Sequence, residues 1–134
     1  MRFLFDTSAL LAHYRDEAGS DRVQEIFDGR DDTFLVASIT LTEFSRRMLA
    51  LGSQPNEIQT VLGEYRHLFH GVVSIDDKIA MRAFVISSNT SERLPLADSL
   101  IAASAICSEA VLVHRDAHFL SITGDLLDQE NLQT

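Results

Sequence analysis

Four acidic side chains stand where short apolar runs of the chain give way to helical patterns: Asp6, Glu43, Asp98 and Asp116. Two carboxylates 4 Å apart repel each other by roughly 4 kcal/mol at an effective dielectric constant of 20. Carboxylates that converge are therefore unstable unless some are protonated or a cation lies between them. Oxygen ligands without a supporting cysteine favour Mg²⁺ or Mn²⁺. Convergence of these acids would thus create a site for one of these ions.

A carboxylate site that binds Mg²⁺ has a defined chemistry. The ion keeps water ligands, one of which can attack a phosphodiester, and a second ion can stabilise the leaving oxygen. Each acid also has a structural interpretation, since Asp6 can cap a helix and Glu43 fits a capping box with Thr40. Asp98 and Asp116 can stabilise the positive end of a helix. Only the joint pattern of the four acids favours metal-dependent hydrolysis.

Short apolar runs alternate with helical patterns, which predicts a parallel sheet with helices on both faces. Because sites in such folds lie beyond the carboxyl ends of the strands, Asp6, Glu43 and Asp116 should share one edge, and Asp98 joins them if its helix begins there. The polar stretch 124–134 holds either an edge strand at Leu126-Leu127 or a tail. Strands are predicted over 2–5, 33–37, 72–75 and 111–113, and helices over 7–14, 20–27, 40–51, 55–69, 76–88 and 96–108, with a helical turn at 117–120.

Length and composition narrow the classes of protein. A chain of 134 residues suits one domain over residues 1–134. The net charge of −9 argues against a broad basic surface for nucleic acid, but not against a nuclease that handles phosphates through metal ions. The apolar runs are too short to span a membrane. A single cysteine, Cys107, and an N-terminus unlike a signal peptide predict a cytoplasmic protein with a reduced thiol.

The four acids lie in segments that together resemble the PIN-domain nucleases, and more narrowly the VapC-type toxins of bacterial and archaeal toxin–antitoxin pairs. The resemblance covers nearly the whole chain in the right order, and it is the ordered set that is specific rather than any one segment. The segments are Phe-Leu-Phe-Asp-Thr-Ser-Ala-Leu at 3–10, Thr-Glu-Phe at 42–44, Leu-Ala-Asp-Ser-Leu-Ile-Ala at 96–102 and Leu-Val-His-Arg-Asp-Ala-His-Phe at 112–119.

The resemblance implies a PIN-like three-layer α/β/α fold with a central parallel sheet of four to five strands. It also implies a metal-dependent endoribonuclease that cleaves structured RNA and leaves 5′-phosphate and 3′-hydroxyl ends. Catalytic roles fall on Asp6, Glu43, Asp98 and Asp116, and Mg²⁺ or Mn²⁺ binding falls on Asp6, Asp98 and Asp116. The expected partners are the RNA substrate, a cognate antitoxin and a second copy of the chain in a homodimer.

Three positions near these acids refine the expectation. Thr7 and Ser8 follow the first acid and match the family's small hydroxyl residues, which hydrogen-bond a carboxylate or a water on the metal. Many members have Thr or Ser two positions before the last Asp, whereas this chain has His114 there. This departure changes the side chain expected beside Asp116.

Arginines beside the acids are candidates for guiding RNA phosphates, namely Arg46, Arg93 and Arg115, with Arg47 next to the first of them. An antitoxin could also place an arginine in the acidic pocket, since a guanidinium offers a charged fork in place of a metal. Apolar helix faces offer surface to partners where they do not pack on the sheet: Leu41, Phe44 and Met48 in one helix, and Ile58, Val61, Leu62 and Tyr65 in the next.

Two other functions are compatible with parts of the pattern. A catalytically silent PIN scaffold that binds RNA or a protein partner is the main alternative, and the four intact acids argue against it. Receiver and phosphatase folds also place an Asp after their first strand. The phosphatase pattern needs a second Asp where Ser8 stands, and a receiver needs a Lys after its last strand, whereas the only lysine is Lys78.

Overall fold

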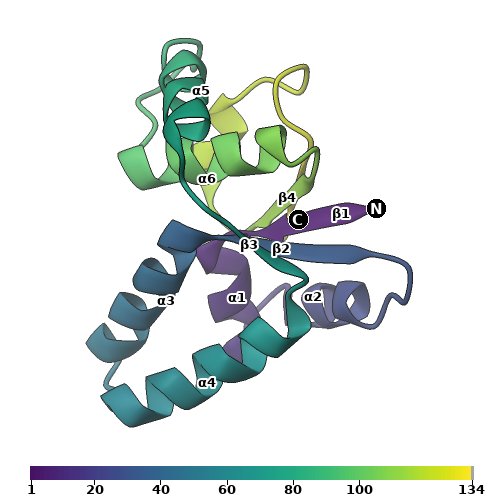
Figure 1. The fold of residues 1–134 in the computed structure, drawn as a ribbon, viewed down its shortest axis with the longest axis vertical. Helices are drawn as coiled ribbons and strands as arrows, with labels where there is room; N and C mark the ends of the chain where they lie inside the picture. The colour runs from purple at the N-terminus through teal and green to yellow at the C-terminus, as the bar shows by residue number, and fades with distance from the viewer. Residues whose placement is uncertain (134) are drawn as a thin grey trace.

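The computed structural model describes residues 1–133 of the chain, in which helices alternate with the strands of one parallel sheet (Figure 1). The strands are β1 (Arg2–Phe5), β2 (Thr33–Ala37), β3 (Gly71–Val73), β4 (Val111–His114) and β5 (Gln129–Asn131). The helices are α1 (Thr7–Tyr14), α2 (Ser20–Phe27), α3 (Ser38–Ala50), α4 (Pro55–Leu68), α5 (Asp77–Ser87) and α6 (Leu96–Cys107), followed by the 3₁₀ helix η1 (Ala117–Ser121).

The sheet has the strand order β3-β2-β1-β4-β5, with β1 at its centre. Leu4 of β1 is paired with Leu35 of β2 on one side and Leu112 of β4 on the other. The central strand is buried on both faces, which is why its sequence is a continuous apolar run rather than an alternating one. Every pairing is parallel, so the carboxyl ends of the strands lie along one edge.

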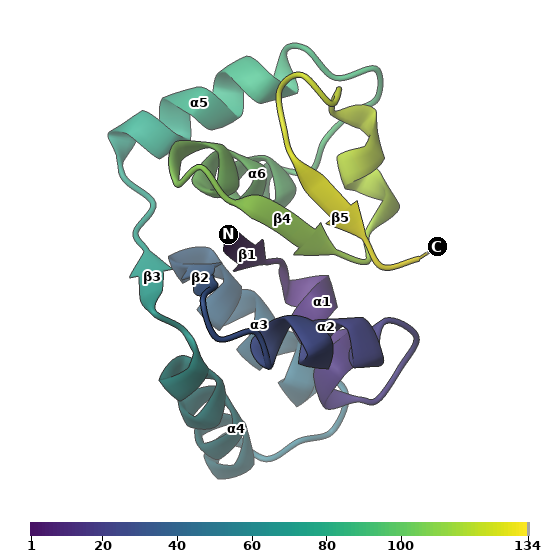
Figure 2. The ribbon, with the colours of Figure 1, turned by 90° about the vertical axis from the view of Figure 1, so that its right-hand side faces the viewer.

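Helices cover both faces of the sheet (Figures 1 and 2). Successive residues of a strand point to opposite faces. In β1, Phe3 and Phe5 pack into a core with α1, α2, α3 and α4, whereas Leu4 packs into a core with α5 and α6. The predicted three-layer α/β/α architecture with a parallel sheet is thereby confirmed.

Helices α3 and α4 turn most of their apolar side chains inward. Phe44 and Met48 of α3 are buried, as are Ile58, Val61 and Tyr65 of α4, while Leu41 and Leu62 are partly buried. These are the faces that the sequence offered to partners. They belong instead to the core, because α3 and α4 pack against each other and, with α1, against the sheet.

The fifth strand differs from its predicted place. The backbone N–H groups of Leu126 and Leu127 both bond to the Thr123 carbonyl, so this segment forms a turn. The predicted strand at Leu126-Leu127 is therefore wrong, and β5 lies three residues further on, where Gln129 pairs with Leu112 of β4. The third strand is also shifted, to Gly71–Val73. Within residues 1–133, no helix is both long and apolar enough to cross a bilayer.

Candidate active site

Asp6 directly follows β1 and caps α1. Its backbone is extended, and its Oδ2 accepts a 3.0 Å hydrogen bond from the backbone N–H of Ser8. Burial raises the pKa of Asp6 from 3.8 to about 7; hydrogen bonds from Ser8 oppose this shift, and the charges of Asp98 and Glu43 add to it. Asp6 therefore caps a helix and also lies within the electrostatic field of two other acids.

Ser8 connects the ends of the neighbouring strands β1 and β4. Its hydroxyl donates to Oδ2 of Asp6 and accepts a 2.9 Å hydrogen bond from the backbone N–H of Arg115. Arg115 directly follows β4, which pairs with β1 in the sheet. One hydroxyl thus orients Asp6 and also fixes the start of the loop that carries Asp116.

Glu43 reaches the site from α3 and contacts α1. Its Oε1 accepts a 2.7 Å hydrogen bond from the hydroxyl of Thr7. Because α3 begins at Ser38 directly after β2, Thr40 lies inside the helix, so the capping-box interpretation of Thr40 and Glu43 is wrong. The hydroxyl of Thr40 is the one buried side-chain polar atom without a hydrogen-bond partner among residues 1–133.

Asp98 enters the site from the first turn of α6 and is 8% exposed. Burial raises the pKa of Asp98 from 3.8 to about 6, and the charges of Asp116 and Glu43 raise it further, while His118 partly offsets the shift. The carboxyl groups of Asp6 and Asp98 therefore respond to the same cause, which is desolvation beside other acids. A divalent cation between these acids would favour their charged forms and so oppose both the burial and the repulsion that raise the two pKa values.

Asp116 and His118 complete the site from the 3₁₀ helix η1. Asp116 caps η1, since its Oδ1 accepts a 3.0 Å hydrogen bond from the backbone N–H of His118. The imidazole Nδ1 of His118 lies 3.1 Å from Oδ2 of Asp98 and 3.1 Å from Oδ1 of Asp116. The three residues offer donor atoms within 4.8 Å of one another, a spacing that can hold a metal ion.

His114, two positions before Asp116, holds that acid in place. Its Nδ1 accepts a 3.1 Å hydrogen bond from the backbone N–H of Asp116, and its Nε2 lies 2.8 Å from Oε1 of Gln129. The amide of Gln129 donates to two backbone carbonyls, so Oε1 accepts and Nε2 of His114 carries the hydrogen. Burial lowers the pKa of His114, which favours this neutral form.

The predicted arginines occupy different parts of the surface. Arg115 lines a cavity of about 330 Å³ with Arg15 and Arg47, beside Ser8. Arg46 lines a second cavity of about 320 Å³ with Glu43 and Arg47. Arg93 is exposed in the loop that leads into α6 and lines neither cavity.

From the sequence alone, no metal-binding role is assigned to His118, and Arg15 is not singled out. His118 follows Asp116 by two residues, and an acid that caps a helix accepts from the second residue after it, so this spacing contained a usable signal. Arg15 follows α1, and its side chain is paired with Glu17 at 3.3 Å. Glu17 also pairs with Arg115 at 3.2 Å, which joins both arginines in one ionic cluster.

The comparison with known families agrees with the fold. The sequence matches the model of the PIN domain over residues 3–124, which is most of its length. The chain therefore belongs to the PIN-domain family, and the resemblance predicted from its acidic segments is confirmed. No curated protein sequence matches the chain.

Solved structures similar to this chain include several VapBC toxin–antitoxin proteins. VapBC2 from Rickettsia felis, bound to a DNA fragment from its promoter, has a TM-score of 0.77 at 18% identity, over 98% of both chains. VapBC-1 from nontypeable Haemophilus influenzae has a TM-score of 0.75 at 18% identity, over 100% of both. DNA-bound VapBC from Salmonella typhimurium has a TM-score of 0.73 at 20% identity, over 98% of both. At these identities the likeness establishes a shared fold.

Proposed function

We propose that the protein is a metal-dependent endoribonuclease and the toxin of a type II toxin–antitoxin pair, folded as one domain over residues 1–134 and acting in the cytoplasm. The observation that carries the proposal is the meeting of Asp6 and Asp98, two buried carboxyl groups with raised pKa values, with Glu43 and Asp116 at the carboxyl ends of the strands. Membership of the PIN family supports the nuclease. The VapBC neighbours support the toxin.

The donor set of the site fits a hard divalent cation. Asp98 and Asp116 would hold the ion, and Asp6 would complete its oxygen ligands. A bound Mg²⁺ or Mn²⁺ supplies positive charge to the phosphate and activates a water molecule. Carboxylates crowded in a buried site keep their protons until a cation offsets their charge, so metal binding and loss of protons are coupled here.

The chain's own residues hold the acids in fixed positions. The hydroxyl of Thr7 orients Glu43, and the hydroxyl of Ser8 orients Asp6. Glu43 and Asp6 are thus anchored by neutral donors that do not compete for the metal. Fixed positions lower the reorganisation needed when charge develops on the phosphate.

An RNA strand can approach the site beside Arg115. The cavity that Arg115 shares with Arg15 and Arg47 borders Ser8, which contacts Asp6. Guanidinium groups form paired hydrogen bonds with phosphate. Glu17 holds Arg15 and Arg115 in the free protein, and a phosphate would replace this carboxylate as their partner. Arg46 extends the basic surface beside Glu43.

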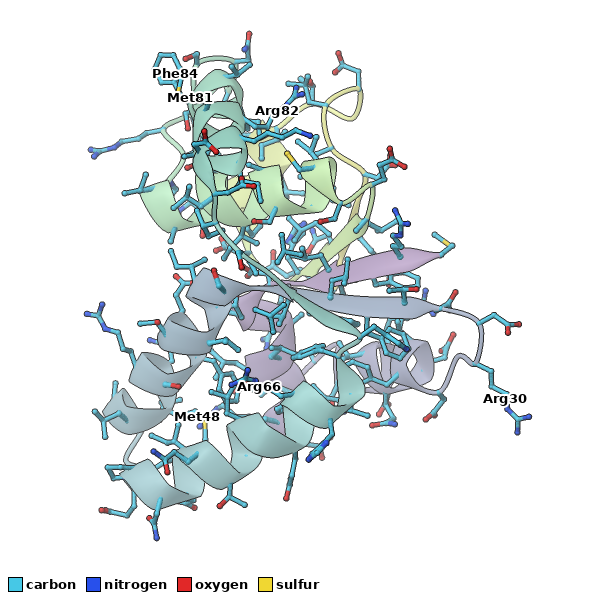
Figure 3. The ribbon with its side chains drawn as sticks, viewed as in Figure 1. Arg30, Met48, Arg66, Met81, Arg82 and Phe84 are labelled. Atoms are coloured by element: carbon cyan, nitrogen blue, oxygen red, sulfur yellow. The ribbon has the colours of Figure 1, made fainter. Side chains whose placement is uncertain are left out.

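Two protein partners belong to the proposal. An antitoxin segment that carries an arginine would enter the acidic pocket and compete with the metal for its carboxylates. A second copy of the chain would form a homodimer over exposed apolar surface. Such surface is present on α5, where Met81, Phe84 and Val85 are 62%, 65% and 47% exposed. Their spacing of three and four residues places them on one face of the helix, and Figure 3 shows Met81 and Phe84 at its outer end.

The proposal is tested by incubating the purified chain with structured RNA in Mn²⁺ or Mg²⁺, and in EDTA as the metal-free control. We expect cleavage only with the metal and products with 5′-phosphate and 3′-hydroxyl ends. Asp31→Asn is the matched control, because Asp31 is exposed in the loop before β2, at the opposite edge of the sheet. RNA that binds without being cut in any metal would contradict the nuclease and favour the silent scaffold.

A further inference from the structure

His118 stands beside two acids of the site and contributes a nitrogen atom to an otherwise oxygen-rich pocket. We propose that His118 is a ligand of the divalent cation held by Asp98 and Asp116, and that it shifts the preference of the site from Mg²⁺ toward Mn²⁺. This inference rests on the proposed function, because it concerns the metal of the same site.

The ring nitrogen of His118 has the spacing of a neighbouring ligand to an oxygen of each acid. Nδ1 of His118 lies 3.1 Å from the nearest oxygens of Asp98 and Asp116. Neighbouring ligands of an octahedral ion with bonds of about 2.1 Å are about 3.0 Å apart. A cation can therefore bind both oxygens and Nδ1 with little rearrangement, displacing any proton from the ring nitrogen.

The backbone holds His118 in this position. Its N–H donates to Oδ1 of Asp116, and the next residue, Phe119, is fully buried against the ring of His114. The imidazole itself is 55% exposed. A cation bound to Nδ1 would thus keep coordination positions open to solvent, where a water molecule or a phosphate oxygen can enter.

Three of the four other histidines in the chain, His13, His70 and His114, are committed to structural hydrogen bonds. Both ring nitrogens of His13 and both of His114 have partners. Nδ1 of His70 accepts the backbone N–H of Phe34. Within the described part of the chain, the histidine whose ring nitrogen lies beside two carboxylates is His118.

An imidazole ligand changes which ion the site prefers. Mg²⁺ is a hard ion that takes oxygen ligands and dehydrates reluctantly. Transition-metal ions accept imidazole nitrogen more readily, and their affinity rises along the series that begins with Mn²⁺. Removing the nitrogen of His118 should therefore weaken Mn²⁺ binding more than Mg²⁺ binding.

The test measures metal binding and ligand identity in the full chain without RNA. Calorimetry gives the Kd for Mn²⁺ and for Mg²⁺ in the wild type, His118→Ala and His118→Asp. Pulsed electron paramagnetic resonance of bound Mn²⁺ detects coupling to imidazole nitrogen, and ¹⁵N-labelled histidine identifies its source. His67→Ala is the matched control, because His67 is exposed on α4, away from the acids.

We expect nitrogen coupling in the wild type and in His67→Ala, and its loss in His118→Ala. The Kd of His118→Ala for Mn²⁺ should rise about tenfold or more, the scale seen when the surroundings of a metal are disrupted, with a smaller rise for Mg²⁺. His118→Asp should bind both ions without nitrogen coupling. Since the imidazole is more than half exposed, these variants should fold.

Three results would overturn the inference and leave the proposed function intact. They are bound Mn²⁺ without nitrogen coupling in the wild type, coupling that persists in His118→Ala, and an equal loss of affinity for both ions. Failure of the wild type to bind either ion at millimolar concentration would overturn the proposed metal-dependent function as well.

Discussion

The site has two halves that are built differently. On the α1 and α3 side, Asp6 and Glu43 are each held by a neutral hydroxyl, from Ser8 and Thr7. On the α6 and η1 side, Asp98 and Asp116 share the imidazole of His118. The first half is therefore fixed by the protein itself, whereas the second half is arranged around a place for positive charge.

The two hydrophobic cores beneath these halves differ in the kinds of side chain that they contain. The core under α1 to α4 is rich in aromatic rings, and Phe5 contacts Phe27 with ring centroids 4.8 Å apart. The core under α5 and α6 is mostly aliphatic, although it includes Phe119, and Ala102, Ala103 and Ala105 of α6 are fully buried. Small side chains let α6 approach the sheet closely, which brings Asp98 to the strand ends.

The largest expected effect is on cleavage, and it should be equal in both halves. Asp6→Asn and Asp98→Asn should each reduce RNA cleavage by at least about 10²–10³-fold, because each removes a charge that the transition state requires. Single-turnover rates measure this, and circular dichroism checks the fold. Near-wild-type cleavage by either variant, with contaminating nuclease excluded, would contradict the proposed roles.

The next effect is a pH dependence of stability in the metal-free protein, which should be larger for Asp6 than for Asp98. The unfolded chain releases the Asp6 proton near its ordinary pKa of 3.8, whereas the folded protein keeps it up to about 7. The folded state thus binds more protons between these values, so stability falls as pH rises through this range. Asp6→Asn should remove a destabilisation of up to about 4 kcal/mol above pH 7.

Urea unfolding of wild type and Asp6→Asn in EDTA, between about pH 5 and 8, measures this effect. The two stability curves should diverge as pH rises, with the variant more stable. Asp98 contributes with the same sign through its raised pKa of about 6, so Asp98→Asn should give a smaller divergence. Parallel curves for wild type and Asp6→Asn would show that burial does not hold a proton on Asp6.

Binding of a divalent ion should stabilise the folded state that the charged acids destabilise. Free Mn²⁺ or Mg²⁺ at 100 times its Kd stabilises the folded state by about 2.7 kcal/mol, which raises the melting temperature by roughly 10 °C. The rise should shrink in Asp98→Asn, because this residue belongs to the half arranged for a cation. Calorimetric melting with and without the ion provides the measurement, and an unchanged curve at millimolar Mn²⁺ would argue against a formed site.

The smallest effect concerns the hydroxyl of Thr7, one of the two hydroxyls that hold the acids of the first half. Thr7→Val removes the donor to Glu43 and should cost about 1 kcal/mol of stability whether or not metal is present. His118→Ala should instead change stability mainly when Mn²⁺ is bound. Thr60→Val, exposed on α4, is the matched control for the loss of a hydroxyl. A metal-dependent effect of Thr7→Val would erase the distinction between the halves.

Much of the fold could be predicted because its strands are apolar and buried. The central strand contains Phe3, Leu4 and Phe5, and such a continuous apolar run must be buried at the centre of the sheet. The edge strand β5 was missed because Gln129, Glu130 and Asn131 lack an apolar signal. Its position depends on pairing with β4, which no local pattern encodes.

The strand-end acids could be predicted because parallel strands bring their carboxyl ends together. Their partners could not, since these are set by contacts between distant segments. Glu43 is bonded to Thr7 across 36 positions, and only that tertiary contact excludes a capping box. The direction of the His118 ring follows from the 3₁₀ turn at Asp116, which has no hydrophobic period to reveal it.

The link from Gln129 through His114 to Asp116 makes one part of the pocket depend on the last strand of the sheet. Asp6, Glu43 and Asp98 all precede β5 in the chain, yet the backbone at Asp116 is held by a histidine whose own partner lies in β5. The last strand therefore supports the pocket without contributing an acid to it, because its pairing with β4 brings Gln129 to the histidine behind Asp116.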